Sequence, residues 1–194
     1  MSDELKIAEI RKNVEMLIKD GEILKQKEPK FVQFFMKNSY DSLESAKLLF
    51  KVSTDRKIAE NLNQPDFNGL LWVINSSYYS MFYAARALLE SIGVNIKAKH
   101  SIHAVTFSSL VYYFYTTGKL QKSFVEDFRN AETESAEILG REKAESLLKN
   151  YSYEMGKRSS FTYELGNVVI KSKAETSLER AKLFNVEVKR ILKM

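Results

Sequence analysis

The chain of 194 residues contains no cysteine, only 2 prolines and only 7 glycines. Without cysteine, a disulfide framework, a thiolate zinc site and a cysteine nucleophile are all excluded. A β-sandwich or barrel needs a turn roughly every ten residues, so the scarcity of glycine and proline favours long helices. The N-terminal stretch MSDELKIAEIRK lacks the apolar segment of a signal peptide, and we therefore expect a cytoplasmic protein.

Several motifs of enzymes are missing as well. A di-iron site in a helical bundle requires a glutamate three residues before a histidine, and neither His100 nor His103 has one. The sequence contains no G-x-x-x-x-G-K-[ST], no G-x-G-x-x-G and no H-E-x-x-H. A serine nucleophile needs a strand–turn–helix elbow, which an all-helical chain lacks. We therefore expect no metal site and no cofactor.

The overall charge permits a polyanionic partner without requiring one. Hydrophobic residues make up 44% of the chain, which is enough for a core and argues against disorder. The 30 basic and 25 acidic residues give a net charge of +5, but they are interspersed, as on solvated helix faces.

The stretch from Asp66 to Ile92 is predicted to form the central helix. Apolar and aromatic residues occupy nearly every face of it, which is typical of a helix that is buried on most sides. Polar residues including Arg86 interrupt it and argue against a membrane span. Asp66 or Asn68 is expected to cap its start, and Gly93 to end it. The aromatic run Tyr78–Tyr83 is accordingly expected in the core, although base-stacking platforms also use such residues.

Further helices are predicted on both sides of this segment from apolar spacing, glycine breaks and capping signals. Ser101, Ser123 and Ser172 are the expected N-caps of three of them, the last two through S-x-x-E capping boxes. Before the central helix, the predicted elements are helices at Asp3–Lys25 and Lys30–Val52 and a loop from Ser53 to Pro65 with a short helical turn at Ile58–Leu62. After it come a basic connector from Val94 to Lys99 and a helix at Ile102–Tyr115. Three further helices run from Ser123 to Leu139, where Gly140 closes the helix, from Arg141 to Met155, and from Ser172 onward. The fold class is therefore all-α: an N-terminal helical arm (1–29) and an up-and-down bundle of four to five core helices (30–194).

Two segments are candidates for anion binding. Lys97, Lys99 and His100 precede a predicted helix, whose free backbone N–H groups attract anions. Ordinary capping beside a solvated connector explains the same pattern. In KRSSFTYE, Arg158 is able to clamp a phosphate, and Tyr163 follows five residues later. An interhelical ion pair with a tyrosine at the edge of the core is the alternative there.

The order of these segments resembles a known family. It runs SYDSLESAKLLF, NSSYYSMFYAARALLES, a Gly-Val connector, KHSIHAV, a TGKL break, and a late Arg…Tyr element before an amphipathic terminal helix. This order resembles the HEPN domain (higher eukaryotes and prokaryotes nucleotide-binding), and most of all its small stand-alone archaeal and bacterial members. The resemblance covers roughly Phe35 to Leu192, with YYSMFYAARALL as its most specific piece.

The resemblance implies a helical bundle that forms a homodimer with a site in the cleft between protomers, often paired with a small nucleotidyltransferase in a toxin–antitoxin system. Active members resemble metal-independent endoribonucleases with an R-x4-6-H motif. Here Arg158 stands at the arginine position, and Tyr163 stands where the histidine is expected. Because the pKa of tyrosine is ordinarily near 10, Tyr163 is a poor base for RNA cleavage but still a hydrogen-bond donor to phosphate.

Three functions remain open on this basis. The first is a nucleotide- or RNA-binding module, or the partner of a small nucleotidyltransferase, which binds through Arg158, Tyr163, Lys157, His100, Lys97 and Lys99. The second is an active endoribonuclease toxin with a degenerate motif, in which Arg158, Tyr163 and His100 are the catalytic candidates. The third is a structural helical adaptor. No membrane partner is expected.

Overall fold

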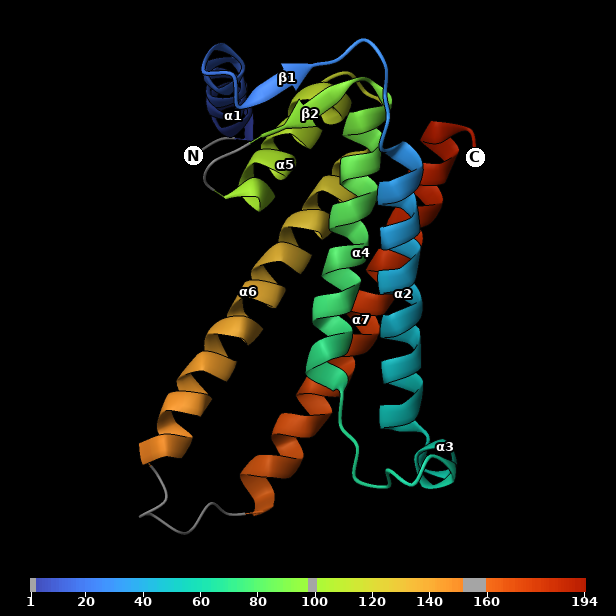
Figure 1. Ribbon diagram of the computed structural model, residues 1–194. Coiled ribbons are helices and arrows are strands. Elements are labelled where there is room, and N and C mark those ends of the chain that lie inside the picture. Colours follow the sequence, from blue (N-terminus) through green and yellow to red (C-terminus); the bar gives the residue numbers. More distant parts are fainter. Residues whose placement is uncertain (1–2, 98–100, 152–159) are drawn as a thin grey trace.

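The computed structural model describes the backbone of residues 3–97, 101–151 and 160–194, and the side chains of residues 7–97, 101–138 and 170–194 (Figure 1). In chain order its elements are α1 (Asp3–Lys19), β1 (Ile23–Lys25), α2 (Val32–Thr54), α3 (Arg56–Asn61), α4 (Leu70–Ser91), β2 (Val94–Ile96), α5 (Ile102–Leu110), the π-helical segment η1 (Val111–Tyr115), α6 (Lys122–Tyr151) and α7 (Ser160–Leu192). The predicted all-α fold class is confirmed.

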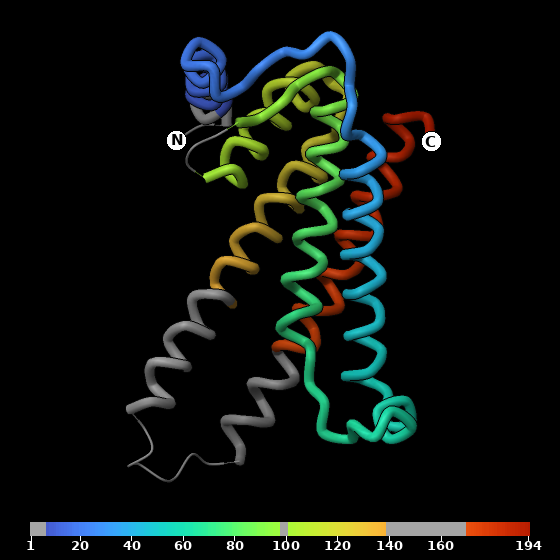
Figure 2. The backbone as a smooth tube through the Cα atoms, viewed as in Figure 1, coloured from blue at the N-terminus to red at the C-terminus, as the bar shows by residue number. Residues whose placement is uncertain are grey.

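Four long helices form an up-and-down bundle. Figure 1 shows that α2 and α6 run away from the end that holds α1, whereas α4 and α7 run towards it. The helix α4 packs against α2, α5, α6 and α7, so it is the central helix, as predicted. The smooth trace in Figure 2 shows the same arrangement, with α3 at the far end of α2.

The core lies around α4 because that helix presents apolar side chains in several directions. Ile74, Met81, Leu88 and Leu89 are fully buried. Phenylalanines from three neighbouring elements close around them, namely Phe114 of η1, Phe128 of α6 and Phe184 of α7. Burying each side chain of this size contributes about 1.5–3 kcal/mol, so α4 supplies much of the driving force for folding.

The N-terminal helix ends earlier than predicted, and a small sheet follows it. The helix α1 stops at Lys19, and two residues later Gly21 adopts a left-handed conformation with φ of 72°. The chain then turns into β1, which pairs antiparallel with β2, so that Ile23 lies opposite Ile96. The prediction of a helix to Lys25 is therefore wrong, and β2 forms the first half of the segment predicted as a basic connector. Alternation over three residues is too short a signal to reveal a strand.

Gly93 serves two purposes at the end of α4. Its φ of 75° favours glycine, as predicted for a residue that ends a helix. It also lies directly against the strand pair, since the backbone N–H of Gln26 donates to its carbonyl oxygen at 2.7 Å. A Cβ atom at this position would lie only 2.2 Å from the carbonyl oxygen of Gln26. Only glycine therefore allows β1 to approach the end of α4.

The two last helices are longer than the sequence predicted. The helix α6 continues through Gly140, and it begins at Lys122, so Ser123 lies inside the helix and is not its N-cap. Likewise α7 begins at Ser160, which places Ser172 well inside it. A glycine in a helix costs only about 1 kcal/mol, which the good helix formers around Gly140 offset. Both capping-box predictions are therefore wrong.

Other predicted boundaries are confirmed. The side chain of Ser101 accepts a hydrogen bond from the backbone N–H of Ala104 at the start of α5. The N-cap residue of α4 is Gly69, but Asn68 before it accepts a hydrogen bond from the backbone N–H of Leu70, as predicted for a residue that satisfies the start of this helix. Gly118 adopts the left-handed conformation expected of a break. The short helical turn predicted near Ile58 is α3. Within the described residues, every helix is too short or too polar to cross a lipid bilayer.

Candidate functional site

A groove of about 350 Å³ runs along α4 on the side that faces α2. One wall is a stripe of α4, in which Trp72, Ser76, Tyr79 and Tyr83 follow one another at steps of three or four residues and therefore share one face. The other wall belongs to α2 and consists of Asn38, Asp41, Ser42 and Ser45. We call this feature the aromatic groove.

The aromatic side chains of the groove are accessible from outside. Trp72 has 51% of its surface exposed, and Tyr79 and Tyr83 are half-buried. The rings of the two tyrosines lie 6.1 Å apart between centroids. The prediction that the run Tyr78–Tyr83 belongs to the core is therefore correct for Tyr78 and Phe82, which are buried, and only partly correct for Tyr79 and Tyr83, which are half-buried against the core.

Hydrogen-bonding groups of both kinds surround these rings. The amide oxygen of Asn75 accepts from Ser135 of α6 at 2.8 Å, and no described residue accepts from its amide nitrogen. The side-chain amide N–H of Asn38 donates to the carbonyl oxygen of Phe34, which leaves the amide oxygen of Asn38 as an acceptor. Asp41 forms an exposed ion pair with Lys37. The groove therefore presents donors and acceptors beside flat apolar surfaces, which suits a planar ligand with polar edges.

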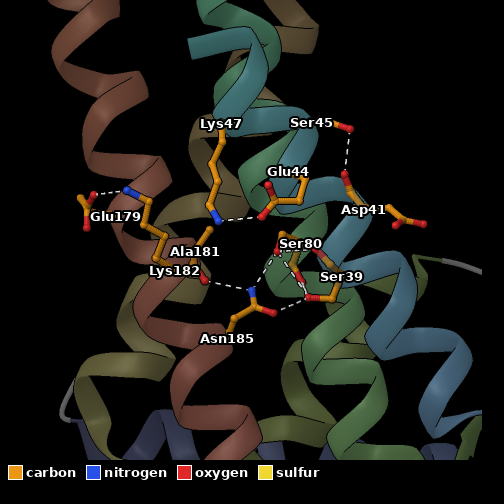
Figure 3. A network of polar contacts seen from close by, with 10 residues as sticks. All are labelled: Ser39, Asp41, Glu44, Ser45, Lys47, Ser80, Glu179, Ala181, Lys182 and Asn185. Atoms are coloured by element: carbon orange, nitrogen blue, oxygen red, sulfur yellow. Dashed lines mark hydrogen bonds and ion pairs between the residues drawn. The ribbon is translucent and has the colours of Figure 1, made fainter. Parts of the chain in front are cut away.

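A buried polar network holds the two walls in place. Figure 3 shows Ser39 of α2, Ser80 of α4 and Asn185 of α7 directed towards one another. The Ser80 hydroxyl donates to the carbonyl oxygen of Ser39 at 2.9 Å, and the Asn185 amide donates to the Ser80 hydroxyl at 2.8 Å. The Ser39 hydroxyl lies 2.7 Å from the Asn185 amide oxygen. Because each member has a partner, we expect this network to favour one register of α2 against α4.

His103 lies beside the aromatic groove. Its ring contacts that of Tyr79 edge-on, with 5.9 Å between centroids, and its Nδ1 lies 2.7 Å from the Tyr78 hydroxyl. Burial lowers the pKa of His103 and raises the pKa of Tyr78 far above its usual range. Both groups are therefore neutral near pH 7, and we infer that Tyr78 donates to Nδ1 while the imidazole proton resides on Nε2.

The described part of the structure does not bring together the residues that are predicted to bind anions. Lys97 is exposed directly after β2, and its backbone N–H donates to the carbonyl oxygen of Glu22 at 2.7 Å. Tyr163 belongs to the first turn of α7, but its side chain lies outside the described residues. The remaining predicted residues, Lys99, His100, Lys157 and Arg158, also lie outside them.

One pattern in the sequence points to the aromatic groove. Polar residues recur beside Trp72 on the same face of α4, at Asn75 and Ser76, where a fully buried helix would place apolar side chains. Within the described residues, no three potential metal ligands come together. Comparison with protein families, characterised proteins and solved structures found no match for this chain. The resemblance to HEPN domains therefore rests on the sequence pattern alone.

Proposed function

We propose that this chain is a HEPN-like helical module that binds a nucleotide or single-stranded RNA, with the base held in the aromatic groove. The observation that carries the proposal is the solvent-accessible stripe of Trp72, Tyr79 and Tyr83 facing a polar wall. Tyr79 and Tyr83 belong to YYSMFYAARALL, the segment with the most specific resemblance to the family. The same residues therefore support both the family and the site.

The chemistry of the groove favours a base over a phosphate. Stacking on aromatic side chains contributes about 1–3 kcal/mol per base and tolerates any base, because each has a π-face. The described lining contains no lysine or arginine, and it includes the Asp41 carboxylate. In this proposal the phosphates are contacted by the cationic residues expected from the sequence, namely Lys97, Lys99, His100, Lys157 and Arg158.

The assembly that the resemblance implies is part of the proposal. A homodimer places two aromatic grooves in one particle, and a small nucleotidyltransferase is the protein partner. RNA is expected to be bound without cleavage, because Tyr163 replaces the histidine of the ribonuclease motif. Recovery of intact RNA after long incubation supports this, whereas cleavage products that disappear on Arg158→Ala favour the endoribonuclease instead.

Trp72 makes the binding test direct because it is the only tryptophan of the chain. We expect AMP and a short oligoadenylate to quench its fluorescence to saturation, while ribose 5-phosphate, which has no base, leaves it unchanged. Tyr83→Ala should weaken AMP binding about tenfold through the lost stacking, and Tyr83→Phe should retain it.

Phe34→Ala is the matched control, because Phe34 is an exposed aromatic residue of α2 outside the groove lining. It should bind AMP like the wild type. Equal quenching by AMP and ribose 5-phosphate, or wild-type affinity in Tyr83→Ala, would contradict the proposal. A protein that binds neither AMP nor RNA would be a structural adaptor.

A further inference from the structure

A second groove, separate from the aromatic groove, opens where α1, α5, η1 and α6 meet. It has a volume of about 230 Å³. Its walls are apolar and come from all four elements: Ile7 and Ile10 of α1, Phe107 of α5, Val111 and Tyr115 of η1, and Val125 of α6. An engineered apolar cavity of about 150 Å³ holds benzene, so this groove has room for a small hydrocarbon body.

A guanidinium group stands at the edge of these apolar walls. Arg129 of α6 lies over the ring of Phe107, with 5.1 Å from its central carbon to the ring centroid. Within the described part of the chain, no residue accepts a hydrogen bond from this guanidinium. Its charge partly opposes the burial that raises the pKa of Glu132. The other charged lining residues, Lys122 and Glu126, pair with each other at 3.4 Å.

The backbone of the groove is unusual as well. Val111 and Tyr115 are the first and last residues of η1, and the backbone N–H of Thr116 donates to the carbonyl oxygen of Val111 at 3.0 Å, five residues earlier. The π-helical form is rare and occurs often at functional sites. Here the first and last side chains of the π-helical segment lie on the same apolar wall.

We propose that this groove binds a small amphipathic carboxylate, with its hydrocarbon body between α1 and α6 and its carboxylate paired with Arg129. The planar fork of arginine matches a carboxylate with two parallel hydrogen bonds, and cation–π contact with Phe107 holds the fork at the edge of the groove. Each methylene that leaves water strengthens binding about fourfold. The ligand therefore needs both parts, a chain and an anionic end.

Isothermal titration calorimetry on the full chain tests this with octanoate, octan-1-ol and butyrate as probes. Octanoate should bind one molecule per chain, about tenfold more tightly than octan-1-ol, because only octanoate offers a charged acceptor to Arg129. Butyrate should bind more than tenfold more weakly than octanoate, because its chain is shorter. Absence of octanoate binding, or equal affinities for octanoate and octan-1-ol, would overturn the proposal.

Two variants assign the contacts. Arg129→Gln should remove the preference for octanoate over octan-1-ol and leave the affinity for octan-1-ol unchanged. The fold should tolerate this change because Arg129 is exposed. Ile7→Asp should weaken both probes by placing a charge on the apolar wall. Arg56→Gln, on exposed α3, is the control and should bind like the wild type. If Arg129→Gln still prefers octanoate over octan-1-ol, this proposal is wrong, whether or not the protein binds AMP.

Discussion

At the scale of single residues, Tyr78 and His103 illustrate how burial sets protonation. The Tyr78 hydroxyl lies 2.7 Å from Nδ1 of His103, and desolvation disfavours the charged form of each group. A neutral imidazole accepts a hydrogen bond from the hydroxyl at Nδ1, whereas an imidazolium has to donate its Nδ1–H to the hydroxyl oxygen instead. Protonation of His103 therefore reverses this hydrogen bond and places a charge in a site whose burial disfavours it.

Stability should consequently depend on the protonation of His103. Its folded-state pKa is lowered by burial from an unfolded value near 6.5, so the unfolded chain binds more protons in the interval between the two values. This contribution to the free energy of unfolding is complete above about pH 6.5 and is lost as pH falls through the folded-state pKa. Urea titrations between about pH 5.5 and 7.5 should show this loss of stability towards low pH in the wild type and not in His103→Gln.

The carboxyl of Glu132 should change stability with pH in the opposite direction, which provides an internal check. Burial raises the pKa of Glu132 from its ordinary 4.5, so its contribution is lost as pH rises through the raised value. His103→Gln leaves that contribution in place. An equal decrease of stability towards low pH in His103→Gln and the wild type would show that His103 is not its source.

At the scale of elements, the helices were easier to predict than their ends. Apolar residues of the last helix recur at steps of three or four, and five of them are buried, namely Ala174, Leu178, Ala181, Phe184 and Val188. Its start was missed because Ser172 and Glu175 match a capping box by sequence alone, although the chain is already helical there. A capping signal marks a helix start only where the preceding residues do not continue the helix.

The start of α2 has a cap that no local sequence pattern contains. Its N-cap residue, Phe31, provides no side-chain hydrogen bond. Instead Oε1 of Glu90, on α4, accepts from the backbone N–H groups of Lys30 and Phe31 at 3.0 and 3.2 Å. Glu90 has only 1% of its surface exposed, and Arg86 beside it is also buried. One carboxylate therefore joins the start of α2 to the end of α4.

Replacement of Glu90 should be costly. Glu90→Leu leaves two partly buried N–H groups without an acceptor and a buried Arg86 without its nearby negative charge, and should lower the free energy of unfolding by about 3 kcal/mol. Glu90→Gln keeps an acceptor and should lose less. Glu44→Leu, which removes an exposed ion pair with Lys47 on α2, is the control and should match the wild type in urea denaturation. Wild-type stability in Glu90→Leu would exclude this capping role.

At the scale of the whole molecule, the bundle and its central helix followed from composition and apolar spacing, but the aromatic groove did not. The sequence predicts Tyr79 and Tyr83 in the core because apolar residues occupy nearly every face of this helix. Which face stays open depends on where α2 and α6 lie around α4, and that information is distributed over the neighbouring helices. The sequence of α4 alone does not contain it.

The position of α2 against α4 depends in turn on the network of Ser39, Ser80 and Asn185, which joins α2, α4 and α7 although these helices lie far apart in the sequence. Because all three side chains are buried, removing one leaves the others with polar groups that have lost a partner. Replacing all three with apolar residues removes that penalty. The network therefore selects one register of the bundle more than it adds to stability.

The free energies of unfolding of single and combined variants should reveal this. Asn185→Leu alone should destabilise the protein by about 2 kcal/mol, and the triple variant with Ser39→Ala and Ser80→Ala should recover part of the loss. If the network sets the register, the triple variant should also lose the single environment of Trp72 on α4, which will appear as a broadened and shifted fluorescence emission at unchanged helical content. Additive losses across the three substitutions, with the Trp72 emission of the wild type, would mean that apolar packing alone sets the register of α2 against α4.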